Sequence, residues 1–399
     1  MVHQSNRLCI IDSMRGFSLL GILLANMLIF QYGIWGKDEI ALYSLSQADS
    51  AARTLLHIFV EGSFMPIFTF LFGFGMIKMK ESLETKGLKP KRYLARRFLL
   101  LFAAGIVHGT YLWEGDILGF YGGMGFFLLL FMNRKAKTLL IWGALLLSLF
   151  GLLGLAPEST SNHSLTEDKP RMETYVKETI TIYGTGTYEE IKHHRNTADP
   201  LGLNDYLIVG MLLFAPLLTA PLFLFGMYAA KKRWFRQPDD ERSMYLKGML
   251  NFLPIGLLLK GAKVVFPGQG WSEMAEMIGG NLLSLGYIFA FSHLYAAAKS
   301  SPWFLRFEAL GKLSLTNYLL QSIICTSIFY GYGMGWFGKL GVIAGCGLAL
   351  VIYIGQLFLS RWYLTRFQSG PVERVLRMWT YFSFSGKSRS KVPYESSSI

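Results

Sequence analysis

The sequence predicts an all-α membrane protein, a helix bundle of about ten spans with both termini in the cytoplasm. Of its 399 residues, 52% are hydrophobic and only 16% are charged, whereas soluble domains carry about a quarter charged residues. The apolar residues occur in runs of about 17 to 25, the length of a helix that crosses a bilayer. The basic residues fall mostly on alternate loops, as the positive-inside rule requires. This placement accounts for the net charge of +13 without a nucleic-acid partner.

The expected spans form two groups of five, one on each side of a long polar segment. The loop 78–97 holds eight basic residues, so we place it in the cytoplasm, and it fixes the orientation of the other loops. Spans three and four come from an apolar hairpin, 96–133, around the polar turn Trp113-Glu114-Gly115-Asp116. The other spans are predicted at 10–35, 54–77, 138–155, 206–230, 248–266, 275–298, 313–330 and 340–359.

These spans divide the chain into a first membrane half (1–156), an extracytoplasmic loop (157–204), a second membrane half (205–360) and a basic cytoplasmic tail (361–399). Within the loop, residues 171–182 predict a short amphipathic helix that ends at a glycine-containing turn. His193 and His194 follow, and we expect them in a solvated loop because no third metal ligand accompanies them. The string Leu-Phe-Gly occurs at 71–73 and again at 224–226, and we interpret this echo as helix packing.

Ionisable and amide side chains inside the predicted spans are candidate functional residues, because a charged group at membrane depth costs roughly 3 kcal/mol. The first span carries Asp12, Arg15 and Asn26 on one stripe, with Arg15 and Asn26 about 16 Å apart along the axis. Such a stripe faces protein or a cavity. The structural alternative is an Asp12–Arg15 pair at the cytoplasmic interface, with Asn26 hydrogen-bonded to a neighbouring helix.

Two histidines have a carboxylate near them. His57 and Glu61 are four residues apart, and therefore on one face of the second span near its outer end. His108 lies in the first run of the hairpin, and Asp116 opens the second. A histidine beside a carboxylate is the usual arrangement of a general base or a proton relay. We expect His108, Asp116 and Glu61 to share one outer site; the alternatives are a snorkelling His57–Glu61 pair and a neutral, structural His108.

Amide side chains in the inner half of the ninth span complete the set. Asn317 and Gln321 share one helix face, and with Asp12 and Arg15 they are the candidates for binding a cofactor. Interhelical hydrogen bonds are the structural alternative. The three cysteines are scattered, and no metal-ligand spacing, phosphate-binding glycine loop or hydrolase motif is present. The sequence therefore predicts no metal.

Several strings together resemble the YeiB-like family of bacterial multi-spanning membrane proteins, whose function is largely undefined. The resemblance covers nearly the whole chain and implies a location in the bacterial cell membrane. The strings are Asp12-Ser13-Met14-Arg15-Gly16 with Asn26; Phe68-Thr69-Phe70-Leu71-Phe72-Gly73-Phe74-Gly75; Gly105-Ile106-Val107-His108 with Trp113, Gly115, Asp116, Ile117 and Leu118; Leu315-Thr316-Asn317-Tyr318-Leu319-Leu320-Gln321-Ser322; and Gly370-Pro371 with Glu373.

A more distant resemblance implies a reaction. The Asp-x-x-Arg-Gly start, with an Asn ten residues after the Gly, is similar to the first catalytic-domain span of heparan-alpha-glucosaminide N-acetyltransferase. That enzyme belongs to a transmembrane acyltransferase superfamily, whose members move an acyl group from cytosolic acyl-CoA to an acceptor across the membrane. Asn26 matches the active-site asparagine. The family's catalytic histidine has no counterpart at matching spacing, which leaves His57 and His108 as candidates.

The sequence therefore leaves three functional classes open. An acyltransferase would take acyl-CoA from the cytoplasm and pass its acyl group to a small-molecule, lipid or glycan acceptor. A transporter would line a substrate path with the same polar residues, and His57, Glu61 and His108 would relay protons. A membrane scaffold would use every polar residue structurally. The discriminating feature is a cavity. An acyltransferase needs a cytoplasmic pocket that reaches Arg15 and meets an outer pocket near His108, a transporter needs a midplane site with alternating access, and a scaffold needs neither.

Overall fold

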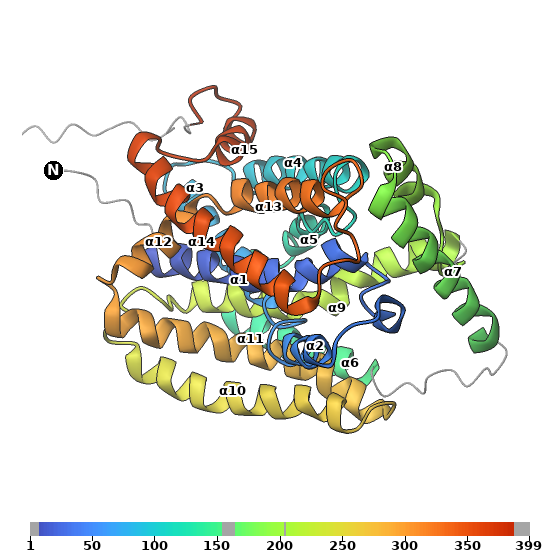
Figure 1. Cartoon of the computed structure of the whole chain (residues 1–399). Helices are drawn as coiled ribbons and strands as arrows, with labels where there is room; N and C mark the ends of the chain where they lie inside the picture. Colours follow the sequence, from blue (N-terminus) through green and yellow to red (C-terminus); the bar gives the residue numbers. More distant parts are fainter. Residues whose placement is uncertain (1–7, 154–163, 203–204, 387–399) are drawn as a thin grey trace, which may run out of the picture.

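The structure, a computed structural model, describes residues 8–153, 164–202 and 205–386. Over these ranges the chain forms fifteen α-helices, one short 3-10 helix and no strand, which confirms the all-α prediction. The long helices lie side by side in one bundle, and α1 (Cys9–Tyr32) runs through its middle (Figure 1). The start of the predicted outer loop and the end of the predicted tail lie outside the described residues.

Within the described ranges, five helices are long and apolar enough to cross a membrane, so the protein is an integral membrane protein. They are α1, α9 (Asp205–Lys231), α10 (Arg242–Val265), α11 (Gly270–Ala298) and α14 (Val342–Arg366). The remaining predicted spans correspond to shorter or more charged helices, and the number of spans stays a prediction. These helices are α3 (Met65–Glu84), α4 (Pro90–Tyr111), α5 (Leu118–Leu128), α6 (Ala136–Leu153) and α13 (Ser314–Phe329).

The prediction of one continuous helix over 54–77 is wrong. The chain forms α2 (Gln47–Phe59), then a turn through Gly62, and then α3. Gly62 has a φ of +66°, a conformation that favours glycine, and Pro66 lies in the first turn of α3, where its missing N–H costs nothing. With 13 residues α2 is about 20 Å long, too short to cross a bilayer. Figure 1 shows it nearly end-on, across the direction of the long helices.

The predicted outer loop contains two helices, α7 (Ser164–Thr185) and α8 (Tyr188–Thr197), which lie together at one end of the bundle (Figure 1). The predicted segment 171–182 is part of α7, which ends at the predicted turn. The prediction of a solvated loop at His193 and His194 is wrong, because both lie in α8, whose first turn is closed by a capping box. His194 is buried, with its ring stacked on Tyr175 and Nε2 2.8 Å from the Thr179 hydroxyl.

The predicted tail begins as helix. α14 continues to Arg366, and after a short break α15 (Pro371–Tyr381) lies against α4 (Figure 1). Two short elements connect the remaining helices. They are η1 (Ile40–Tyr43), after α1, and α12 (Pro302–Lys312), which packs against α1.

The repeated Leu-Phe-Gly string marks the crossing of α3 and α9. A Cβ on Gly73 would lie 2.1 Å from the Phe223 carbonyl oxygen, and a Cβ on Gly226 would lie 1.9 Å from the Phe70 carbonyl oxygen. The two helices therefore approach at reciprocal glycines, as small residues permit in membrane bundles. This is the packing that the echo in the sequence predicts.

Candidate functional site

A cavity of about 530 Å³ opens at the end of the bundle that carries the basic loops. Its walls come from α1, α3, α4, α5, α12, α13 and α15. The deeper walls are apolar and aromatic, with Phe68, Phe72 and Tyr121 among them. The cavity can thus hold a ligand with a polar end at the mouth and an apolar or flexible part inside. Five basic residues line it: Arg15, Lys78, Arg97, Lys312 and Arg377.

The predicted pair Asp12 and Arg15 lies at this cavity. Arg15 Nη1 donates to Asp12 Oδ1 at 3.0 Å, and both residues are lining residues. Leu19 and Ile22, one and two turns further along α1, also line the cavity. Asn26 is not a lining residue but continues the same stripe one turn beyond Ile22. The polar stripe predicted from the sequence thus leads from the mouth towards the inner end.

The inner end of the cavity is formed by Tyr318, which packs against His108 with ring centroids 5.6 Å apart. His108 is buried, and its Nδ1 lies 2.8 Å from Asp116 Oδ1. Asp116 is held by the Gly119 N–H, which donates to its Oδ2 at 2.8 Å. If Nδ1 carries the proton that bonds Asp116, Nε2 is free to act as a base. Among the described residues Nε2 has no hydrogen-bond partner.

The contact between His108 and Asp116 depends on a close approach of α4 and α5. A Cβ on Gly105 would lie 1.9 Å from the Gly119 backbone nitrogen and 2.6 Å from Asp116 Oδ2. Glycine at this position lets the hairpin close, and the chain folds back so that Asp116 reaches the last turn of α4. Further out, Trp113 packs beside His108 and stacks on Phe30, with ring centroids 4.1 Å apart.

Phe30 follows Asn26 by one turn of α1. The face of α1 that begins at the cavity mouth therefore ends at Phe30, which stacks on Trp113 beside His108. The outer side of the His108 region is covered by α7 and α8. The Tyr183 hydroxyl donates to Glu114, and Arg195 donates to the backbone oxygens of Thr110 and Leu112.

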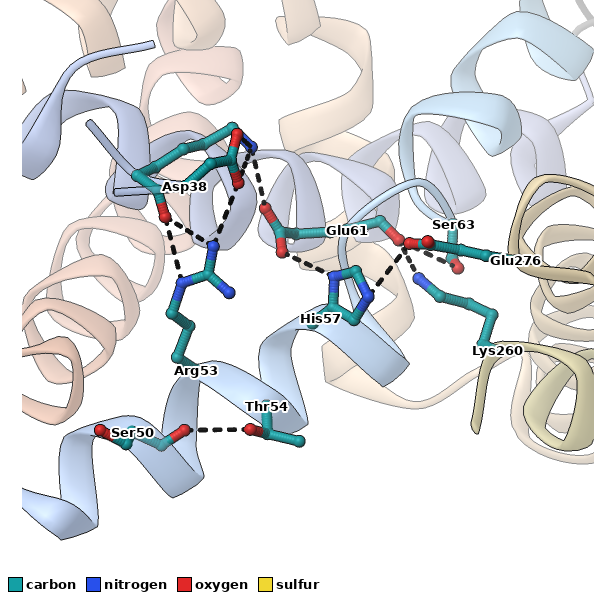
Figure 2. Close-up of polar contacts among 10 residues, drawn as sticks. Asp38, Ser50, Arg53, Thr54, His57, Glu61, Ser63, Lys260 and Glu276 are labelled. Atoms are coloured by element: carbon teal, nitrogen blue, oxygen red, sulfur yellow. Dashed lines mark hydrogen bonds and ion pairs between the residues drawn. The ribbon is translucent and has the colours of Figure 1, made fainter. Parts of the chain in front are cut away.

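His57 and Glu61 belong to a different cluster, so the prediction that Glu61 joins His108 and Asp116 finds no support. His57 Nδ1 lies 3.3 Å from Glu61 Oε2, and Nε2 lies 3.1 Å from Glu276 Oε1 on α11 (Figure 2). An imidazole between two carboxylates donates from both nitrogens, which favours its protonated form. Lys37 lies 3.7 Å from Glu61 Oε1 and extends the cluster towards the segment after α1.

Three lysines, Lys260, Lys263 and Lys339, lie in or near the predicted outer ends of spans 7 and 10, where the positive-inside rule predicts few basic residues. Lys260 on α10 is 1% exposed and donates to the backbone oxygen of Glu61 (Figure 2). Lys263, one turn further, pairs with Glu273. Lys339 donates to the Gly335 carbonyl oxygen at 2.7 Å. Each of the three ammonium groups thus has an oxygen partner close by, which offsets part of the cost of placing its charge there.

The predicted cofactor residues on the ninth span bond between helices. Asn317 Nδ2 donates to Ser360 Oγ at 3.0 Å, and Gln321 Nε2 donates to Gln356 Oε1 at 2.8 Å. Gln356 Nε2 in turn donates to the Asn317 carbonyl oxygen at 3.0 Å. Neither Asn317 nor Gln321 is among the cavity-lining residues, and their role in cofactor binding stays a prediction.

Sequence reasoning missed residues that only the packing brings to the sites. Tyr318 closes the cavity beside His108, and Arg377 on α15 joins Arg15 and the predicted basic loop residue Arg97 at the mouth. Glu276 completes the surroundings of His57. Each carried a weak signal, since Tyr318 follows Asn317 in a family string and Glu276 is a charge near the start of an apolar run.

The fold is that of a helical integral membrane protein. Its cavity is lined by Tyr318, which packs against His108, while His108 and Asp116 themselves are not among the lining residues. Residues 229–383 match a family described as "Protein of unknown function (DUF418)". The chain is 33% identical to the uncharacterized protein YxaH of Bacillus subtilis (strain 168) over 397 residues, 95% of this chain and 96% of that protein. The chain belongs to this YeiB-like family.

A second relative is the uncharacterized protein YeiB of Escherichia coli (strain K12). It is 27% identical over 389 residues, which cover 93% of this chain and 95% of that protein. A third, an uncharacterized 39.9 kDa protein of Bacillus acidopullulyticus, is 27% identical over 402 residues, with 95% of each chain covered. No solved structure matches this chain.

Proposed function

We propose that the protein is an acyltransferase of the bacterial cell membrane, which moves an acyl group from cytosolic acyl-CoA to an extracytoplasmic or membrane acceptor. The observation that carries this proposal is the cavity, whose mouth holds Arg15 and whose inner end is Tyr318, packed on His108. The mouth suits anionic phosphates, because guanidinium groups bind phosphate in bidentate pairs. The aromatic and aliphatic walls suit the flexible arm of the donor.

In this mechanism the thioester lies at the inner end of the cavity. His108 Nε2 takes the proton from the acceptor's hydroxyl or amine, and Asp116 stabilises the imidazolium that forms. The acceptor's oxygen or nitrogen bonds to the carbonyl carbon, and the carbon–sulfur bond breaks. The leaving thiolate takes the proton back from His108, so the residues are unchanged after one cycle. The amide of Asn26, on the α1 stripe, would stabilise the negative charge on the carbonyl oxygen.

The test is transfer from radiolabelled acetyl-CoA in proteoliposomes. His108→Ala and Asn26→Ala are each expected to abolish transfer, whereas Arg15→Ala should chiefly weaken binding of the donor. His193→Ala is the matched control, because His193 is an exposed histidine on α8. A wild-type protein that binds no acyl-CoA at millimolar concentration would contradict the proposal.

A transporter is the second candidate, and the cluster around His57 favours it. Ionisable residues within membrane proteins often mark ion and proton paths, and this cluster joins α2, α10 and α11 through His57, Lys260 and Glu276. A transporter would move a labelled substrate across proteoliposomes in response to a proton gradient and would transfer no acyl group. The acetyl-CoA assay therefore separates the two functions.

A further inference from the structure

The mouth of the cavity carries more positive charge than its own carboxylates balance. Three of its five basic residues form ion pairs: Arg15 with Asp12, Lys78 with Glu81, and Lys312 with Glu308. Arg97 and Arg377 line the same cavity and lie within electrostatic range of each other and of Arg15. Across the described ranges, neither Arg97 nor Arg377 has a hydrogen bond or an ion pair. The N–H donors of both guanidinium groups are therefore left for a ligand, and the Glu373 carboxylate lies within electrostatic range of Arg97.

Glu373, the carboxylate that shares the mouth with these arginines, is bound elsewhere. Its Oε1 accepts from the N–H groups of Leu315 and Thr316 at 2.8 and 3.0 Å, and its Oε2 accepts from the Thr316 hydroxyl at 2.6 Å. These groups belong to the first turn of α13, and a helix N-terminus favours a carboxylate. Glu373 thus anchors α15 on α13 and positions Arg377 at the mouth.

We propose that Arg97 and Arg377, together with Arg15, form a clamp for the phosphate groups of a coenzyme A thioester, with α15 supplying one side of the clamp. This inference rests on the proposed function, since it assigns the donor's phosphates to the mouth. A guanidinium presents a planar fork of donors that matches phosphate oxygens, and two guanidinium groups whose donors are not engaged suit a pyrophosphate or a phosphomonoester. The contribution of Arg377 comes from the C-terminal helix α15, which is far in sequence from the predicted catalytic spans but packs against α4.

The geometry of α4 selects a donor with a long arm. Arg97 and His108 are 11 positions apart, and therefore on nearly the same face of the helix, about 16 Å apart along its axis. A donor whose phosphate binds Arg97 can place its reacting carbonyl at His108 only if an arm of about that length joins the phosphate to the carbonyl. The phosphopantetheine arm of coenzyme A thioesters is of this kind, whereas an acyl phosphate has no arm.

The experiment measures binding of coenzyme A, inorganic pyrophosphate and acetyl-pantetheine, which lacks phosphates, to the purified full-length protein by calorimetry. Arg97→Gln and Arg377→Gln are each expected to weaken coenzyme A binding about 10- to 100-fold, the effect of losing a hydrogen bond to a charged group. Pyrophosphate binding should fall with it, and acetyl-pantetheine binding should not change. Arg374→Gln is the matched control, because Arg374 is exposed on α15 and does not line the cavity.

Equal affinity of the wild type and both Gln variants for coenzyme A would overturn the clamp. If Arg97→Gln does not fold, Arg377→Gln on the exposed helix still tests the idea, and Arg97→Lys should keep part of the affinity through its charge. Coenzyme A binding that needs Arg97, in a protein that transfers no acyl group, supports the clamp and counts against the proposed function. Acyl transfer that needs His108 but neither Arg97 nor Arg377 supports the proposed function and counts against the clamp.

Discussion

Gly105→Ala tests how the candidate site is assembled. The added Cβ would lie 1.9 Å from the Gly119 backbone nitrogen, whereas an ordinary contact is 3.4 Å or more. α4 and α5 must therefore separate by more than an ångström, which also pulls Asp116 away from His108. Overpacking of this kind costs about 1–3 kcal/mol, against a gain of roughly 0.5–1 kcal/mol for alanine over glycine in a helix. We expect a net loss of about 1–2 kcal/mol in the free energy of unfolding, and loss of transfer activity.

The assay is thermal unfolding in detergent, followed by the acetyl-CoA assay. Gly123→Ala is the matched control, because Gly123 lies on α5 and a Cβ there would meet nothing within 4 Å. This control should unfold at the same temperature as the wild type or slightly higher. A Gly105→Ala protein that unfolds at or above the temperature of the control would refute the close approach of α4 and α5.

Three further predictions address topology and the outer clusters. A cysteine at Thr185 should be labelled on intact cells by an impermeant maleimide, and a cysteine at Thr85 should not; the opposite pattern would invert the topology. His57→Ala removes the donor between two carboxylates and should lower the free energy of unfolding by about 1–2 kcal/mol, measured against His193→Ala, which should change it little. Burial lowers the pKa of His194 below its ordinary value of 6.5, so folding favours its neutral form. The α7–α8 pair should then lose stability as pH falls below about 6.5, seen as faster hydrogen exchange, and His194→Gln should remove that dependence.

The sequence predicts those contacts that a short connection enforces. His108 and Asp116 are joined by the tight turn of one hairpin, and the structure places them in direct contact. The stripe of α1 follows from helical periodicity, so Asp12 and Arg15 could be assigned to one face and are found lining one cavity. The Leu-Phe-Gly echo likewise predicts a helix crossing, because only small residues allow backbones to approach so closely.

Two predictions failed for different structural reasons, a break in the backbone and a tertiary contact. The segment 54–77 is apolar enough for one span, but the positive φ of Gly62 and the position of Pro66 divide it into α2 and α3. His194 looked solvated because its surroundings in the sequence are polar. Burial came from Tyr175 and Thr179 on the preceding helix, a tertiary contact that hydropathy does not report.

Glu61 and His108 belong to different clusters, and the sequence could not predict this. Hydropathy places a residue at a depth along the membrane normal, and both residues were expected near the outer side. It gives no lateral position, which depends on the faces through which the helices pack. Glu61 follows α2, and its partners His57 and Glu276 turn it towards α11. His108 instead contacts Asp116, two residues before α5, and Tyr318 on α13. The two carboxylate–histidine pairs were therefore expected at a similar depth but lie between different helices.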